Sequence, residues 1–367
     1  MASASKEPWF YELDHILRET LVQELEKRGI HPEKAIEIFK DVLDEVIQEL
    51  TPKIFNTLKV NMPALLKENK KMRRSFEKRQ YELWKEPLDM LEAFLHLSIE
   101  VGDVVNRDLR LTATEENCFL IDAVTRLHGQ ACLIGGEILT LLRSGFADGA
   151  NARWRSLHEI VVIASFIRKK GNEVAKRYLE HNSIESYKAL SEYQKNVKRL
   201  NLIPFSSDEV SLVLEEQKRL IEKYGNSYKN AYGWASSALS MKKPRIVDIE
   251  KSVKLDHLRP YYRMASHHVH PNPKSILFKL GLSHLSKEII LAGPSNAGLA
   301  DPGQGMAISL NQINNELLVL EPSLMGIATQ KTMAMWVEEL CSKFIQVHRI
   351  VEKRWFQGKS GKPTEMQ

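Results

Sequence analysis

The chain has 367 residues, of which 43% are hydrophobic and 27% are charged, and its formal net charge is +5 at pH 7. This composition is typical of a globular protein with a buried core. No run approaches the ~18 consecutive apolar residues that a membrane span needs, and the N-terminus has no apolar signal core. The three cysteines are odd in number and form no CxxC pair, so we expect reduced thiols in a cytoplasmic protein with no membrane partner.

Helical periodicity dominates the first third of the chain. Apolar residues at helical spacing predict helices over 7–28 and from residue 33 to Thr51-Pro52, with another interruption at Pro63. An amphipathic helix is expected over 88–105. A further helix is expected from about Thr112, because a threonine followed by acids suits a helix start, and it should run to residue 142. We place an N-terminal helical region at 1–100.

The rest of the chain is richer in apolar residues and is expected to form a core domain over 101–357, followed by a flexible tail over 358–367. Helices are predicted over 150–168, 173–200, 208–224 with a Ser207 cap, 247–270 with a break at Pro260, and 307–355 with a kink near Pro322. Residues 271–306 are predicted as one long irregular loop in which the pieces ILFKL and IILA pair as short strands. The fold class is therefore all-α, a multi-helix bundle with an N-terminal helical extension.

Basic residues are concentrated between Lys67 and Lys85, where aromatic side chains are interleaved with them. The candidates for nucleic-acid binding are Lys70, Lys71, Arg73, Arg74, Lys78 and Arg79. Such a segment can follow a phosphate backbone. The alternative interpretation is a solvated helix that links two modules.

Common catalytic signatures are absent from the sequence. It contains no GxxxxGK[ST], GxSxG or HExxH motif, which excludes Walker-type ATPases and α/β hydrolases. The glycine-rich segment over 293–305 is interpreted as a loop.

A first candidate site is the pair Arg155 and Glu159, which lie four residues apart and therefore on one helix face. The apolar residues that follow carry this helix into the core. A charge that is taken into the interior of a bundle needs a partner. The pair is therefore either a structural clamp or part of a functional site.

A second candidate site is the segment from Arg263 to Pro271, which holds three histidines. At about 100° per residue, a helix face can be shared by Arg263, Ser266, His267 and His270, whereas His268 points roughly 140° away from Arg263. Histidine titrates near neutrality, which suits proton transfer, and arginine binds phosphate with two hydrogen bonds. The alternative is a capping histidine beside a structural arginine.

At these residues the chain resembles the HEPN superfamily of helical domains, many members of which carry an arginine and a histidine with four to six residues between them and cut RNA without metal. Both Arg263–His268 and Arg263–His270 satisfy the spacing, and helical geometry favours His270. Arg155-x-x-x-Glu159 followed by Ser266-x-x-x-His270-Pro also resembles a bacterial family of unknown function found among phage-defence genes. The resemblance covers about residues 100–355, and Met264 stands where many HEPN nucleases have a polar residue.

The resemblance implies a metal-independent ribonuclease without cofactors, acting on RNA as a defence or toxin effector. In such a site His270 takes the proton from a 2′-hydroxyl, Arg263 stabilises the phosphate charge, and Arg155 with Glu159 helps to hold or orient the phosphate. It also implies a homodimer and a partner protein from the same operon. Two alternatives remain open: a non-catalytic helical module that binds protein or nucleic acid, and a metal-dependent enzyme that uses His267, His268 or His270 with Glu159.

Overall fold

The computed structural model describes residues 18–19, 22–23, 26–27, 29, 35–115, 118–282 and 290–360. The chain forms two compact units, residues 1–76 and 77–367. The helix predicted over 7–28 lies largely outside the described residues, as does most of the predicted tail. A domain boundary near residue 100 stays a prediction.

One helix, α2 (Ala35–Glu115), replaces the several that the prolines and capping residues predicted. It passes through Pro52 and Pro63 without a break, and both prolines lie at exposed positions. A proline inside a helix removes one backbone hydrogen bond, and the bonds on either side of each proline keep the helix continuous. The predicted start at Thr112 is also wrong. The next helix, α3 (Phe119–Arg143), begins later, and its Leu120 N–H donates to Asn172 Oδ1 at 2.9 Å.

The second unit is built from helices. After α3 come α4 (Ala147–Lys170), α5 (Asn172–Glu180), α6 (Asn182–Leu200), α7 (Ser207–Tyr224), η1 (Asn226–Lys229), η2 (Gly233–Ala235), α8 (Ser236–Leu239), α9 (Ile246–Ser252), η3 (Asp256–Leu258), α10 (Arg259–Val269), α11 (Pro273–Leu277), α12 (Ala300–Leu318) and α13 (Leu324–Ser360). The protein is 84% helical, so the predicted all-α class is confirmed.

Strand is absent from the described residues, so the short strands predicted over 276–280 and 289–292 are wrong for the residues that can be seen. The first piece lies partly in α11. Asn272 caps that helix by accepting from Ser275 N at 3.1 Å, and Pro273 occupies its first turn. Both features favour a helix start over a strand.

Three other boundaries differ from the expected ones. The helix predicted over 173–200 is interrupted at His181, whose Nε2 lies 2.9 Å from the Tyr228 carbonyl oxygen. Ser206, not Ser207, caps α7, and it forms a capping box with Glu209. The irregular stretch is shorter than predicted because α12 begins at Ala300. The interruption near Pro322 is confirmed by the gap between α12 and α13.

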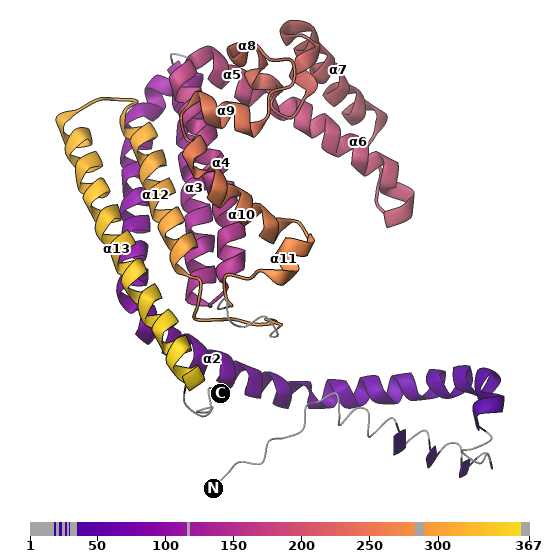
Figure 1. Ribbon diagram of the computed structural model, residues 1–367. Helices are drawn as coiled ribbons and strands as arrows, with labels where there is room; N and C mark the ends of the chain where they lie inside the picture. Colours follow the sequence, from indigo (N-terminus) through magenta and orange to yellow (C-terminus); the bar gives the residue numbers. More distant parts are fainter. Residues whose placement is uncertain are drawn as a thin grey trace. The chain divides into compact units, whose positions relative to one another are not determined.

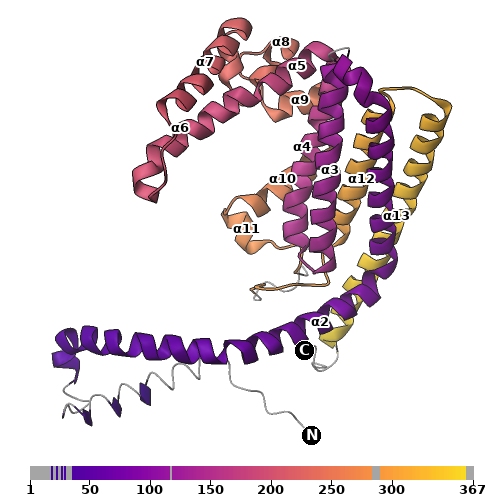
Figure 2. The ribbon, with the colours of Figure 1, turned by 180° about the vertical axis from the view of Figure 1, so that it is seen from behind.

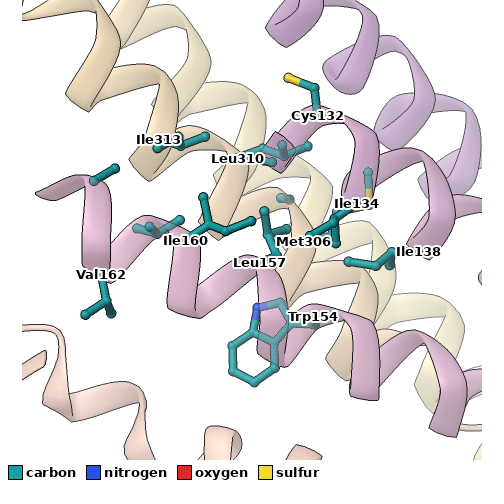
Figure 3. Close-up of a cluster of buried hydrophobic side chains, with 14 of the residues drawn as sticks. Cys132, Ile134, Ile138, Trp154, Leu157, Ile160, Val162, Met306, Leu310 and Ile313 are labelled. Atoms are coloured by element: carbon teal, nitrogen blue, oxygen red, sulfur yellow. The ribbon is translucent and has the colours of Figure 1, made fainter. Parts of the chain in front are cut away.

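The core of the second unit lies where α3, α4 and α12 run side by side, with α13 along α12 (Figures 1 and 2). Figure 3 shows buried side chains from all three helices in this core, including Ile138, Leu157 and Leu310. Burying each such side chain contributes about 1.5–3 kcal/mol. In the described part of the chain, no helix combines the length and apolar character that a membrane crossing requires.

Candidate functional site

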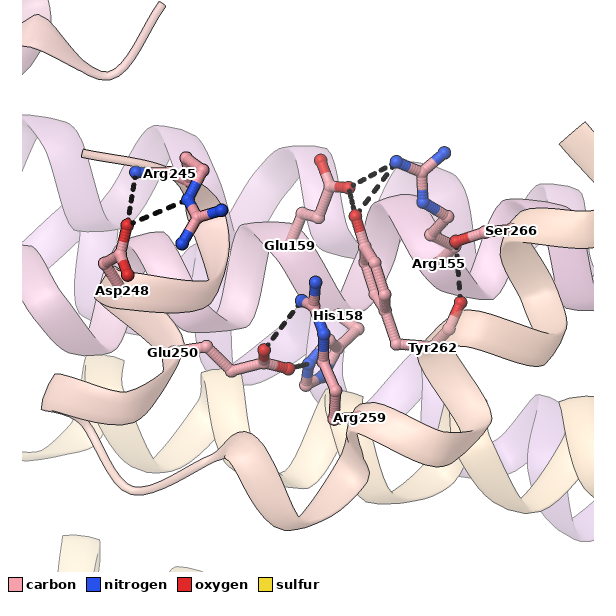
Figure 4. A network of polar contacts seen from close by, with 9 residues as sticks. All are labelled: Arg155, His158, Glu159, Arg245, Asp248, Glu250, Arg259, Tyr262 and Ser266. Atoms are coloured by element: carbon pink, nitrogen blue, oxygen red, sulfur yellow. Dashed lines mark hydrogen bonds and ion pairs between the residues drawn. The ribbon is translucent and has the colours of Figure 1, made fainter. Parts of the chain in front are cut away.

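Three side chains join α4 to α10 in one closed set of contacts (Figure 4). Arg155 Nη2 donates to the Tyr262 hydroxyl at 2.9 Å and lies 3.2 Å from Glu159 Oε1. The same hydroxyl donates to Glu159 Oε1 at 2.5 Å. The spacing of Arg155 and Glu159 by one helical turn lets both reach a single phenol. We refer to these three residues as the arginine–tyrosine–glutamate cluster.

The cluster is half-buried, since the side chains of Arg155 and Glu159 are 24% and 27% exposed. Burial, followed by the hydrogen bond to Glu159, raises the pKa of the Tyr262 phenol. The phenol therefore stays protonated and holds its hydroxyl hydrogen toward the carboxylate. Arg155 and Glu159 therefore lie beside the helix that carries Arg263, and Tyr262 is the residue through which the two helices meet.

A second ion pair lies deeper, directly beneath the cluster. His158 Nε2 and Glu250 Oε1 are 2.9 Å apart, and both side chains are only 1% exposed. Arg259 Nη1 donates to the other Glu250 oxygen at 2.9 Å. The Arg259 guanidinium also lies 4.8 Å from the centre of the Tyr262 ring, and Arg155 lies 4.9 Å from it. Figure 4 shows the two arginines on either side of this ring.

Sequence reasoning missed Tyr262, His158, Glu250 and Arg259. A signal existed for two of them, because His158 precedes Glu159 on a helix that becomes buried, and Tyr262 precedes Arg263 at the start of the second motif. Glu250 is an ordinary acid in a short helix. Only tertiary packing brings it to His158, and no spacing along the chain encodes that contact.

The outer, exposed face of α10 carries other residues of the second candidate site. Arg263 and His270 are exposed, and neither side chain makes a hydrogen bond or ion pair with a described residue. His270 stands one residue beyond the helix in an extended conformation, as Pro271 predicts. The Ser266 hydroxyl donates to the Tyr262 carbonyl oxygen at 2.8 Å, so it is used within the helix. Neither the Arg263 nor the His270 side chain is hydrogen-bonded to the cluster.

His268 lies on the opposite, buried face of α10. Its side chain is 2% exposed, and its Nδ1 lies 3.1 Å from Asp148 Oδ1, but the alignment is too poor for a hydrogen bond. Burial lowers the pKa of His268, although the Asp148 carboxylate opposes the shift. His268 is therefore buried on the side of α10 away from Arg263, whereas His270 is exposed and lies just beyond the helix.

Asn272 organises the turn that follows α10. Its Oδ1 accepts from Ser275 N, which directs its Nδ2 toward His267 Nδ1 at 3.1 Å and toward the His270 carbonyl oxygen at 3.3 Å. His267 Nδ1 therefore acts as an acceptor, and the ring proton is on Nε2. The turn that carries His270 is thus held by a side chain outside the motif.

The basic residues predicted to bind nucleic acid all lie on α2 and are exposed. They are Lys70, Lys71, Arg73 and Arg74 in the first unit and Lys78 and Arg79 in the second. Both interpretations, a nucleic-acid contact and a solvated helix, fit an exposed helical segment.

Within the described ranges, no three His, Cys, Asp or Glu side chains gather as a metal site would require. Glu159 is bound to Tyr262, and His268 faces Asp148, so these candidate ligands are directed to different places. The arrangement therefore does not bring together the ligand set of the metal-dependent alternative.

A comparison with known proteins supports the resemblance to a family of unknown function. The sequence model of a family of unknown function, DUF5677, matches residues 121–288, which include both motifs and helices α3 to α11. Over these residues, less than half of the chain, the protein is similar to that family. No curated protein and no solved structure matches the chain.

The hydroxyl of Tyr262 can be tested alone. Because it bridges Arg155 and Glu159 at a half-buried position, Tyr262→Phe should lower the free energy of unfolding by about 1–2 kcal/mol. Urea unfolding monitored by circular dichroism measures this. The matched control is Tyr261→Phe at the neighbouring exposed tyrosine, which should change stability by less than about 0.5 kcal/mol. Equal effects of the two substitutions would contradict a bridging role.

Stability should also fall in mild acid. Burial lowers the pKa values of His128, His181 and His268 below their ordinary value of 6.5. As the pH falls below about 6.5, the unfolded chain binds protons that the folded chain resists. The stability associated with these neutral histidines is therefore fully present above pH 6.5 and declines below it. Melting temperatures at pH 7.5, 6.5 and 5.5 should decrease in that order, less steeply in His268→Gln. A flat wild-type profile would contradict this.

Proposed function

We propose that this protein is a metal-independent endoribonuclease that cuts RNA at the outer face of α10. The observation that carries the proposal is the exposure of Arg263 and His270 beside a rigidly held interior: both are open to solvent. The cluster beneath fixes α10 against α4. Residues that served only to stabilise the helix would more commonly be paired or buried.

The proposed reaction follows from the side chains. His270 accepts the proton of an RNA 2′-hydroxyl, whose oxygen attacks the adjacent phosphorus. The bond from phosphorus to the 5′-oxygen of the next nucleotide breaks, and that oxygen takes a proton from water. Arg263 binds the phosphate oxygens with its planar guanidinium and stabilises their developing charge. The products are a 2′,3′-cyclic phosphate and a 5′-hydroxyl. Arg155 and Glu159 act by positioning α10 through Tyr262.

The wider biological role belongs to the same proposal. The HEPN resemblance supports a homodimer and a role as a defence or toxin effector. The exposed basic residues between Lys70 and Arg79 support RNA binding along α2. A partner protein from the same operon stays an expectation.

A second function, a non-catalytic module that binds protein or nucleic acid, is favoured by one observation. The side chains of Arg155, Glu159 and Tyr262 are bonded to one another, and the Ser266 hydroxyl is bonded to its own helix. Such mutual bonding is what a structural cluster requires. The two functions differ in whether the exposed His270 is needed for a reaction.

Incubation of the purified protein with mixed RNAs in EDTA tests this directly. We expect cleavage by the wild type and none by His270→Ala, because the general base is removed. His257→Ala, at an exposed histidine of η3, is the control and should retain full activity. Cleavage that stops in EDTA, or that survives in His270→Ala, would contradict the proposal.

A further inference from the structure

A cavity of about 260 Å³ lies between α4, α10 and α12. Its walls include Asn151, Trp154, Tyr261, Met264, Asp301 and Gln304, none of which belongs to the polar contacts of Figure 4. The volume suits a small molecule with a single ring. We refer to this space as the α12 cavity.

The aromatic wall of the cavity is rigid. Trp154 Nε1 donates to Ser309 Oγ at 3.1 Å, which fixes the indole. A Cβ atom at Gly305 would lie 2.8 Å from Trp154 Nε1, so the indole can lie this close to α12 only because residue 305 is glycine. Tyr261 and Met264, three residues apart on α10, line the cavity as well. Aromatic faces of this kind attract cations as well as apolar groups.

The charge that lines the cavity is negative. Among the described residues that line it, Asp301 is the one with a charge, and no basic side chain is present. Asp301 is exposed in the first turn of α12, and its carboxylate makes no hydrogen bond or ion pair with a described residue. It is therefore open to pair with a cation that enters from solvent.

Gln304 adds a second acceptor on the same face of α12, three residues after Asp301. Its Nε2 donates to the Cys341 carbonyl oxygen at 3.0 Å, which fixes the orientation of the amide. Its Oε1 is therefore the atom that remains to accept a hydrogen bond. An ammonium group has three donors and could use both acceptors at once.

We propose that the α12 cavity binds a small organic cation, an amine with a single apolar ring. The ammonium group lies between the Asp301 carboxylate and Gln304 Oε1, and the ring lies against Trp154 and Tyr261. An anion of the same shape should not bind, because it would meet the Asp301 carboxylate and no lysine or arginine among the described residues lines the cavity. This inference does not depend on RNA cleavage.

The test uses tyramine as the probe and 4-hydroxyphenylacetate as its anionic counterpart, because the two share a ring and differ in the charged group. In calorimetric titrations of the full chain, tyramine should bind and 4-hydroxyphenylacetate should show no binding at millimolar concentration. Asp301→Asn, which keeps the shape of the side chain, should weaken tyramine at least about tenfold, or 1.4 kcal/mol.

Asp208→Asn is the matched control, because Asp208 is likewise an exposed acid in the first turn of a helix, α7. It should leave tyramine binding unchanged. Equal binding of the two probes, equal binding of tyramine by wild type and Asp301→Asn, or no binding of tyramine would overturn the proposal. Unchanged circular dichroism spectra of both variants establish that the comparison concerns folded protein.

Discussion

Glu250→Ala is expected to lower the free energy of unfolding by about 3–5 kcal/mol, because it leaves His158 and Arg259 without their shared partner. His158 and Glu250 are almost fully buried and 2.9 Å apart, so water cannot replace the lost contact. Urea unfolding measures the loss. Glu222→Ala, at an exposed acid of α7, is the control and should change stability by less than about 0.5 kcal/mol.

The coupling between His158 and Glu250 should also appear in a double-mutant cycle and in the pH dependence of stability. His158→Ala and Glu250→Ala should be strongly non-additive, because each removes the same interaction. Burial acts to raise the pKa of Glu250, but His158 and Arg259 outweigh it and the net shift is downward from 4.5. This contribution to stability is therefore fully present above pH 4.5 and is lost as the pH falls below that value. Additive effects of the two substitutions would show that the pair is not coupled.

Arg263→Ala is expected to lower the rate of RNA cleavage by about 10²–10³-fold, the usual loss when a charge-stabilising donor is removed. The melting temperature should hardly change, because the side chain is exposed and bonded to no described residue. Arg263→Lys keeps the charge but loses the paired donors, so its activity should be intermediate. Lys243→Ala removes an exposed cation outside α10 and should be fully active. Full activity of Arg263→Ala would remove Arg263 from the site.

Much of the fold follows from apolar periodicity, and the exceptions have physical causes. The buried helix over 150–168 was predictable because apolar residues surround its second half, and α4 shows that burial. The continuity of α2 through Pro52 and Pro63 was not predictable, because a proline favours the end of a helix without compelling it. The start of α3 at Phe119 depends on a distant acceptor, Asn172, which local capping rules cannot identify.

The candidate site was predictable in part from the spacing of residues along a helix. Helical spacing placed Arg155 and Glu159 on one face and His268 away from Arg263, as observed. It could not reveal that Tyr262 would join the pair. The phenol reaches it through the packing of α10 against α4, which sequence spacing does not contain.

The most direct measurement of the proposed function is the chemistry of the RNA ends produced in EDTA. An RNA oligonucleotide and its fully 2′-O-methylated form would be incubated with wild type and with His270→Ala, and the fragments identified by mass spectrometry. We expect wild type to give 2′,3′-cyclic phosphate and 5′-hydroxyl ends from the unmodified RNA, and no fragments in the other three reactions. Fragments with 3′-hydroxyl ends, cleavage of the methylated RNA, or an intact RNA after incubation with wild type would contradict it.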